Sequence, residues 1–422
     1  MSFALDRKKT GLWSVAILLA LAAPVAIYIF YILKYSANVP FWDDYESVLA
    51  FLNQYVPANG LHDKLALVFA QHNEHRTVFN NIIELAQYRI AGKTDFVQLI
   101  ILGNTGWILT VYVLYAEFRG YGIGRIYFLP VMLVMFSFSI WEPMIWAMCS
   151  IQFFYGVLFP LASLYFLCRR PGLPGFVLCL LFMGLSVFTS SSGFALLPVA
   201  LAALLSRKRV AESAIALFVA ALLLLTYFYF LKYVKPPYEP PYAVSPAGLS
   251  KFALAFLGSA ISRSVLADMV FGFLFFLAFI GLGAKGLYKR DGGFVFWAAF
   301  MAVLTGIEVA TGRSGFGLRI AMASRYTVFS VLLISLLYLG ALSLLKDKKG
   351  ALKKFGAVCL AFSLVFYAVA FSRGAYQIKL RHRWLESKTL VYDNPAQAAL
   401  ILMESERLGI YHRELAGPDS LN

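Results

Sequence analysis

The sequence predicts an all-α fold, a polytopic transmembrane helical bundle of about eleven spans. Its 422 residues are 60 % hydrophobic and only 14 % charged, whereas soluble domains carry roughly 25 % charged residues. Apolar runs of membrane-spanning character also recur along the whole chain. We place the spans near residues 12–33, 97–116, 126–140, 150–168, 174–189, 194–206, 213–232, 265–285, 293–311, 325–345 and 355–372.

The first apolar run resembles a secretory signal peptide, because Arg7, Lys8 and Lys9 precede it. It continues to Leu33, which is long enough to cross the bilayer, and no small-residue cleavage site ends it. We therefore expect it to be the first span. The four cysteines lie in or near apolar segments without metal-ligand spacing, and we interpret them as small hydrophobic residues.

The connections between spans alternate in charge, and six of them in one set are basic. The positive-inside rule places this set, and the N-terminus, in the cytoplasm, and it places the C-terminus on the outer side. Topology and anionic lipid account for the net charge of +15, so nucleic acid is not an expected partner. The basic set comprises Arg7 to Lys9, Arg119 with Arg125, Arg169 with Arg170, Arg207 to Arg209, Lys285 with Lys289 and Arg290, and Lys346 to Lys354.

The outer set contains the longest connection, residues 34–96. We expect it to form amphipathic helices lying on the membrane, over Tyr45–Tyr55 and Leu61–Ile90. The Pro-rich loop 233–250 is too rich in proline to be helical. We divide the chain into a transmembrane bundle, 1–372, and a short outer tail, 373–422. The tail contains Arg381-His382-Arg383-Trp384 and a helix-like stretch, Asn394–Leu408.

Two adjacent carboxylates, Asp43 and Asp44, directly follow the first span. Adjacent acids at a membrane surface repel each other, so a purely structural loop gains little from them. A site that takes a proton from a hydroxyl, or that grips a cation, gains more. The alternative is a solvated acidic loop.

A second polar cluster is Gln71-His72-Asn73-Glu74-His75-Arg76. On the expected helix, His72 aligns with His75 and Arg76, and Asn80 and Glu84 continue the stripe. Three interpretations are open: a solvated face, a site supporting the Asp pair, and a metal site. The metal-site interpretation is the least favoured, because Glu74 would point away from the histidine face of the helix.

Two further groups belong to the outer ends of spans. Glu142 and Gln152 flank one outer turn, and Thr189–Gly193 forms another. Polar groups at membrane depth usually face a cavity. The alternative is that these are two ordinary turns. Arg313, Arg319 and Arg325 run against the positive-inside bias. An anionic partner such as a lipid-linked phosphate would explain them, and ion pairing with Glu308 is the structural alternative.

Nucleotide-binding motifs are absent from the sequence, and an outer site has no access to cytoplasmic nucleotides. Any activated donor must therefore cross the membrane on a lipid. With these features the chain resembles integral-membrane glycosyltransferases of the GT-C fold. That family has a first span, a long outer loop that opens with an acidic pair, and then many spans; Asp43-Asp44 matches the pair in type and position.

More narrowly, the chain is similar to bacterial membrane proteins that modify O-antigen (lipopolysaccharide) and other surface polysaccharides of the cell envelope. The stretches that carry this resemblance are Phe41 to Asp44, Gln71 to Arg76, Trp141 to Phe154, Ser192 to Pro198, and Ser324 to Tyr326. The larger GT-C enzymes have a soluble outer domain after the last span, whereas about fifty residues follow it here. Recognition of the acceptor is therefore left unplaced.

The resemblance implies a multi-pass protein of the bacterial inner membrane whose outer side is the periplasm. It implies transfer of a sugar from a polyprenyl-phosphate donor to a glycan or lipid-linked acceptor, with inversion. Asp43 or Asp44 would be the general base, and Arg325 would neutralise the leaving phosphate. The residues expected to bind substrate or donor are His72, Glu74, His75, Arg76, Glu142, Gln152, Arg313 and Arg325.

Several alternatives stay open at this point. The sequence identifies no certain cofactor, and a divalent cation (Mg or Mn) between Asp43 and Asp44 is one option. Two adjacent acids titrate as a coupled pair. A flippase or transporter of a lipid-linked sugar is one rival function. A polymerase of surface polysaccharide and a non-catalytic assembly protein are the others.

Overall fold

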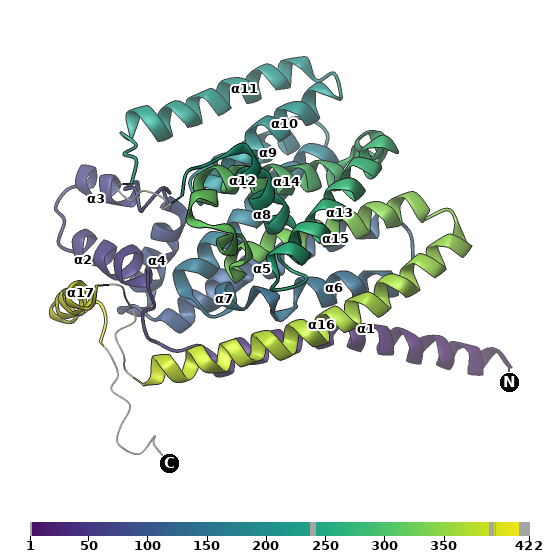
Figure 1. The fold of residues 1–422 in the computed structure, drawn as a ribbon, viewed down its shortest axis with the longest axis horizontal. Coiled ribbons are helices and arrows are strands. Elements are labelled where there is room, and N and C mark those ends of the chain that lie inside the picture. Colours follow the sequence, from purple (N-terminus) through teal and green to yellow (C-terminus); the bar gives the residue numbers. More distant parts are fainter. Residues whose placement is uncertain (1, 237–241, 388–391, 393, 413–422) are drawn as a thin grey trace, which may run out of the picture.

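The computed structural model describes residues 2–236, 242–387, 392 and 394–412, and the regular elements of this part of the chain are all helices, without strands (Figure 1). The predicted polytopic helical bundle is confirmed, and the described residues contain nine segments long and apolar enough to cross a membrane. Seven are single helices and one is the broken segment Arg125–Met144. The ninth segment is α11 (Val210–Leu225) with η5 (Thr226–Phe230). In α1 the membrane-spanning part begins at Trp13. The single helices are α1 (Ser2–Tyr35), α5 (Phe96–Arg119), α8 (Ala147–Arg169), α13 (Val265–Ala284), α14 (Phe294–Arg313), α15 (Ser324–Leu345) and α16 (Lys349–Glu386).

Two of the expected spans are short. Helix α9 (Leu173–Val187) and helix α10 (Leu196–Leu205) follow one another through the 3-10 turn η4 (Ser191–Ala195). Fifteen residues of α-helix rise only about 22 Å, less than the roughly 30 Å of hydrocarbon. These two helices therefore form a hairpin that brings η4 to the same end of the bundle as the start of α8.

A further helix, α12 (Pro246–Gly258), was missed by the sequence analysis. Its 13 residues are too few for a span, and it begins inside the predicted Pro-rich loop. Residues 237–241 of that loop lie outside the described part of the chain. Helix α12 packs closely on α13, where a Cβ on Gly258 would come within 2.8 Å of the Asp268 carbonyl carbon.

The helix ends divide the bundle into a basic end and a site end. The basic end carries the connections that contain Arg119, Arg169 and Arg207. There the Arg169 guanidinium donates to the Glu117 carboxylate, with Nε 2.6 Å from Oε2, and ties α5 to α8. The site end carries residues 36–95, which fold as η1 (Tyr45–Ala50), α2 (Phe51–Tyr55), α3 (Leu61–Val68) and α4 (Val78–Ala91).

The expected continuous helix over Leu61–Ile90 is wrong. It is broken between α3 and α4, where His72 and His75 exchange two backbone hydrogen bonds, 2.8 and 2.9 Å long, across a tight turn. Asn73 has a φ of 51°, a left-handed conformation that asparagine tolerates better than most residues. The histidines are therefore neighbours through a turn and not through helical periodicity.

The C-terminal region belongs to the bundle. Helix α16 is 38 residues long, about 57 Å, so the expected boundary at residue 372 falls inside it. It runs beside α1 (Figure 1). Helix α17 (Pro395–Arg407) matches the predicted Asn394–Leu408 stretch and packs on the first loop, where Asn53 Nδ2 donates to the Ile401 carbonyl at 3.0 Å.

Helices α5 and α8 cross closely in the site region. A Cβ on Gly103 of α5 would lie 2.7 Å from the Ser150 carbonyl carbon of α8. Backbone cannot retreat as a flexible side chain can, so a side chain at position 103 would push the helices apart.

We predict that Gly103→Ala lowers the thermal midpoint of the detergent-solubilised protein, with an overpacking cost of about 1–3 kcal/mol. Gly281→Ala on α13 is the matched control, because nothing lies within 4 Å of its Cβ position and alanine is the better helix former. Equal midpoints for both variants would show that the α5–α8 contact is not this close.

Candidate active site

A cavity of about 530 Å³ opens at the site end of the bundle. Parts of the chain far apart in sequence line it: the turn after α1, the 72–75 turn, the start of α8, the 313–326 region and the end of α16. Eight of the predicted site residues lie in its wall: Asp43, His72, Glu74, His75, Glu142, Gln152, Arg313 and Arg325. Asp44 and Arg76 do not.

The acidic pair is divided between two roles. Asp44 is 2 % exposed, and its two carboxylate oxygens accept backbone N–H groups of Phe41, at 3.0 Å, and Met148, at 2.9 Å. The first bond closes the turn and the second joins it to the start of α8. Asp43 faces the cavity, and Trp42, with a φ of 47°, gives the backbone its change of direction.

Burial raises the pKa of Asp44 to about 7, and the negative charge of Asp43 adds to this. The two N–H donors and the Arg381 guanidinium act in the opposite direction. Asp44 is thus a buried structural group. In the part of the chain that the structure describes, the Asp43 carboxylate has neither an ion-pair partner nor a hydrogen-bond donor, which leaves it available to a ligand.

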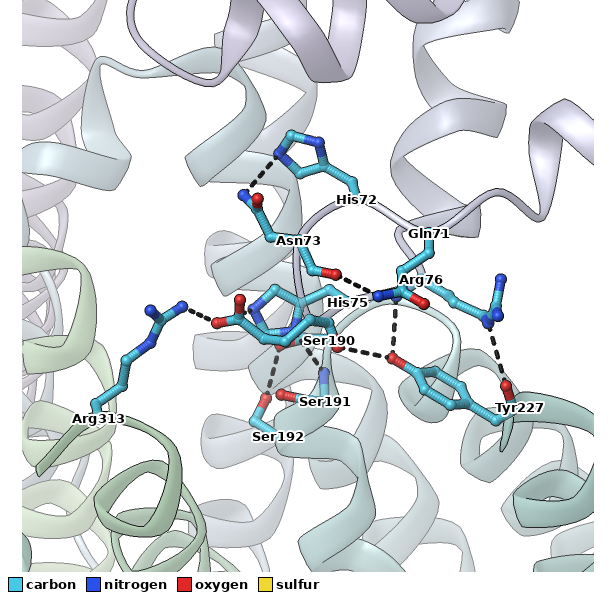
Figure 2. A network of polar contacts seen from close by, with 11 residues as sticks. Gln71, His72, Asn73, His75, Arg76, Ser190, Ser191, Ser192, Tyr227 and Arg313 are labelled. Atoms are coloured by element: carbon cyan, nitrogen blue, oxygen red, sulfur yellow. Dashed lines mark hydrogen bonds and ion pairs between the residues drawn. The ribbon is translucent and has the colours of Figure 1, made fainter. Parts of the chain in front are cut away.

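The 72–75 turn places His75 against η4 (Figure 2). Its Nδ1 accepts the Ser191 N–H at 3.3 Å, so the proton of the neutral ring is on Nε2. Nε2 lies 3.4 Å from Glu74 Oε1, and the Glu74 carboxylate also pairs with Arg313. Burial lowers the pKa of His75 to about 4, although the Asp43 charge opposes the shift.

Arg76, expected to bind substrate, is a structural residue. It is 3 % exposed, and its guanidinium donates to the carbonyls of Phe69, Tyr227 and Leu231. The guanidinium also lies 5.4 Å from the centre of the Tyr227 ring. The expectation relied on helical alignment with His72, whereas the broken helix turns Arg76 toward η5 and away from this cavity (Figure 2).

On the opposite wall, Glu142 holds two arginines. Its Oε2 accepts the Arg325 backbone N–H at 3.0 Å, and its Oε1 lies 3.5 Å from Arg325 Nη1 and 3.7 Å from Arg381 Nη2. The suggested pairing of Arg325 with Glu308 is therefore wrong. Glu308 lines a smaller hollow behind Glu74, beside Ser190 to Ser192.

Arg381 was not recognised in the sequence as a site residue. It is 6 % exposed, and its guanidinium lies 4.1 Å from the ring centre of Phe41, 4.5 Å from that of Trp141 and 5.6 Å from that of Trp146. Aromatic faces attract such a cation. The run Arg381-His382-Arg383-Trp384 was noticed, but only the continuation of α16 brings its first residue to the cavity.

The cavity wall holds three guanidiniums and three carboxylates. Glu74 is paired with Arg313, and Glu142 is shared by Arg325 and Arg381. Asp43 faces this positive wall and has no ion-pair partner among the described residues, so the cavity combines a free base with positive charge for an anion.

The fit of a metal ion was tested on the same geometry. Both oxygens of Asp44 accept N–H donors, so the pair does not present two carboxylates to one cation. The described residues contain no group of three His, Cys, Asp or Glu side chains gathered for a metal. Asp43 is the member of the pair that could contact a divalent cation brought in with a substrate.

Comparison with known proteins found no matching family model, curated protein or solved structure.

We predict that the pH dependence of stability reveals the neutral His75. Its folded pKa, about 4, is below the unfolded value of about 6.5. The unfolded state therefore binds the proton first, and stability is lost as pH falls from about 6.5 toward 4, by up to roughly 3 kcal/mol.

The test compares thermal midpoints of wild type and His75→Asn across that range. The asparagine Oδ1 can still accept the Ser191 N–H, but it does not titrate. We expect a shallower acid loss in the variant, whereas an unchanged pH profile would show that His75 does not titrate in this way.

Proposed function

We propose that this chain is a membrane glycosyltransferase with a GT-C-like arrangement, which moves a sugar from a polyprenyl-phosphate donor to a glycan or lipid-linked acceptor. The observation that carries the proposal is the Asp43 carboxylate, which has no ion-pair partner among the described residues and faces a 530 Å³ cavity that Arg325 and Arg381 also line. The similarity of the motifs to surface-polysaccharide enzymes supports the same choice.

In the proposed reaction, Asp43 takes the proton from an acceptor hydroxyl as that oxygen attacks the anomeric carbon. The bond between the anomeric carbon and the phosphate oxygen breaks, and polyprenyl phosphate leaves with the electron pair. Attack from the face opposite the phosphate inverts the anomeric centre. A positioned base of this kind contributes about 10²–10⁴-fold to the rate.

Arg325 and Arg381 are placed to neutralise the charge that develops on the leaving phosphate. Preorganised positive charge in a site shielded from water is often the largest catalytic term. Glu142 holds both guanidiniums and the Arg325 backbone, so the donors do not need to reorganise during the reaction. Arg313 is less suited to phosphate than the sequence suggested, because Glu74 already neutralises it.

The site lies at one end of a membrane bundle, which suits a donor whose prenyl chain stays in the bilayer. The positive-inside rule makes this end periplasmic in a bacterial inner membrane. A flippase or transporter would need access from both ends, yet the Glu117–Arg169 bridge ties α5 to α8 at the basic end. A one-sided cavity therefore favours transfer over translocation.

We predict that Asp43→Asn abolishes transfer without changing the thermal midpoint, because the substitution removes the base and no described contact. Asp44→Asn should instead lower the midpoint, at a cost of about 1–3 kcal/mol, because its amide N–H₂ would face a backbone donor. The readout is the surface-polysaccharide profile of a deletion strain complemented with each variant. Full complementation by Asp43→Asn would refute the catalytic role.

We predict that Arg325→Lys weakens use of the donor partly and Arg325→Ala much more. Lysine keeps the charge but loses the two-pronged guanidinium that fits phosphate. A short-chain donor analogue should show the same order, because the phosphate is recognised and not the lipid tail. If Arg325→Ala and Glu142→Gln both lower the midpoint while donor use stays intact, the arginine is only a structural ion-pair partner.

A further inference from the structure

A second hollow runs along α16, on the far side of Trp141 from the active-site cavity. Its apolar part, of about 170 Å³, lies against one stripe of α16, and a larger part, of about 600 Å³, continues past Trp141 and Tyr376. Arg263 and Arg373 line both parts. We call this hollow the α16 groove.

The stripe follows helical periodicity. Phe362, Val365 or Phe366, Val369 and Arg373 recur at intervals of three or four residues, so they share one face of α16. Phe366 is packed into the core, but three apolar members remain exposed: the exposed fraction is 47 % for Phe362, 65 % for Val365 and 41 % for Val369. The face is therefore open to the hydrocarbon of the bilayer and ends at an arginine.

Arg263 reaches the same point from the connection between α12 and α13. Its Nη1 donates to the Met322 carbonyl at 3.0 Å, and Asp268 Oδ1 accepts the Ser262 N–H at 2.9 Å, which holds the connection in place. Burial lowers the pKa of Arg263, and the nearby Arg373 charge adds to this, while Glu142 and Asp268 oppose it.

Neither arginine forms an ion pair with a carboxylate among the described residues. Both guanidiniums line the same groove at the end of an apolar stripe, so an anion bound there would contact both of them. Arginine presents a planar fork of donors that fits phosphate oxygens. The apolar part of the groove is small beside the 300–1,000 Å³ typical of drug-sized ligands, so it suits a segment of one hydrocarbon chain.

We propose that the α16 groove binds a phosphate-bearing lipid of the surrounding bilayer. The phosphate lies between Arg263 and Arg373, and the hydrocarbon chain follows Phe362, Val365 and Val369 into the membrane. This site is separate from the Asp43 cavity. It does not depend on the proposed transfer reaction, because lipid binding there involves no chemical step.

The test measures retention of dioleoyl phosphatidic acid by the full-length chain in native mass spectrometry. Arg263→Ala/Arg373→Ala should lower retention at least about tenfold, since the variant loses the charge-assisted hydrogen bonds of two guanidiniums to the phosphate. Val365→Trp should also lower it, because the indole fills the chain path. The matched control is Lys379→Ala/Arg383→Ala, which removes two exposed cations of α16 outside the groove and should change little.

Two comparison ligands separate the possible sources of binding. Dioleoyl glycerol lacks the phosphate and should be retained weakly by all variants. Inorganic phosphate should not displace the lipid. Equal loss in the control variant, displacement by inorganic phosphate, or unchanged retention after Arg263→Ala/Arg373→Ala would each overturn the proposal. The surface-polysaccharide profile is not used as a readout here, so failure would leave the proposed transfer reaction untouched.

Discussion

The candidate site depends on one buried carboxylate. Asp44 accepts an N–H from Phe41, three residues before it, and another from Met148 at the start of α8. The first bond closes the turn after α1, and the second fixes that turn to the bundle. Asp43 owes its direction to this arrangement, because a residue adjacent to a clamped turn has little freedom of its own.

Burying the Asp44 carboxylate has an electrostatic cost, which the neighbouring hydrogen-bond donors and Arg381 reduce. Burial raises the pKa of Asp44 to about 7, and the neighbouring Asp43 charge raises it further, while the two N–H groups and Arg381 oppose the shift. A buried carboxylate with only one of these donors would be more strongly neutralised. The same Arg381 also lies in the cavity wall, so the supporting group and the anion-binding group are electrostatically linked.

The end of the chain completes what the first loop begins. Helix α16 carries Arg381 to the rings of Phe41, Trp141 and Trp146, and α17 packs on the helix that follows the acidic pair. Ser405 Oγ donates to Asn53 Oδ1 at 2.9 Å, and the Tyr411 hydroxyl donates to the Asn38 carbonyl at 2.8 Å. The C-terminal segment is thus packed against the first loop and does not form an independent tail.

Hydropathy and charge, which are local properties of the sequence, determined the helical membrane fold and most of the spans. Their alternation also predicted that Asp43, His72, Glu142 and Arg325 belong to one end of the bundle, since each lies at a connection of the same parity. The lengths of α9 and α10 and the presence of α12 were harder to predict from the sequence, because hydropathy does not distinguish a short span from a packed helix.

Tertiary structure alone decided the roles within the site. Asp43 and Asp44 are equivalent in sequence, and only the bond to Met148, 104 residues away, makes one structural and leaves the other in the cavity. Arg76 was assigned to the site on helical periodicity, which the 72–75 turn breaks, and Arg381 was missed because α16 continues beyond the apolar run. In each case the physical reason is the same: the role depends on a contact with a distant segment, and local pattern contains no information about which distant segment will supply it.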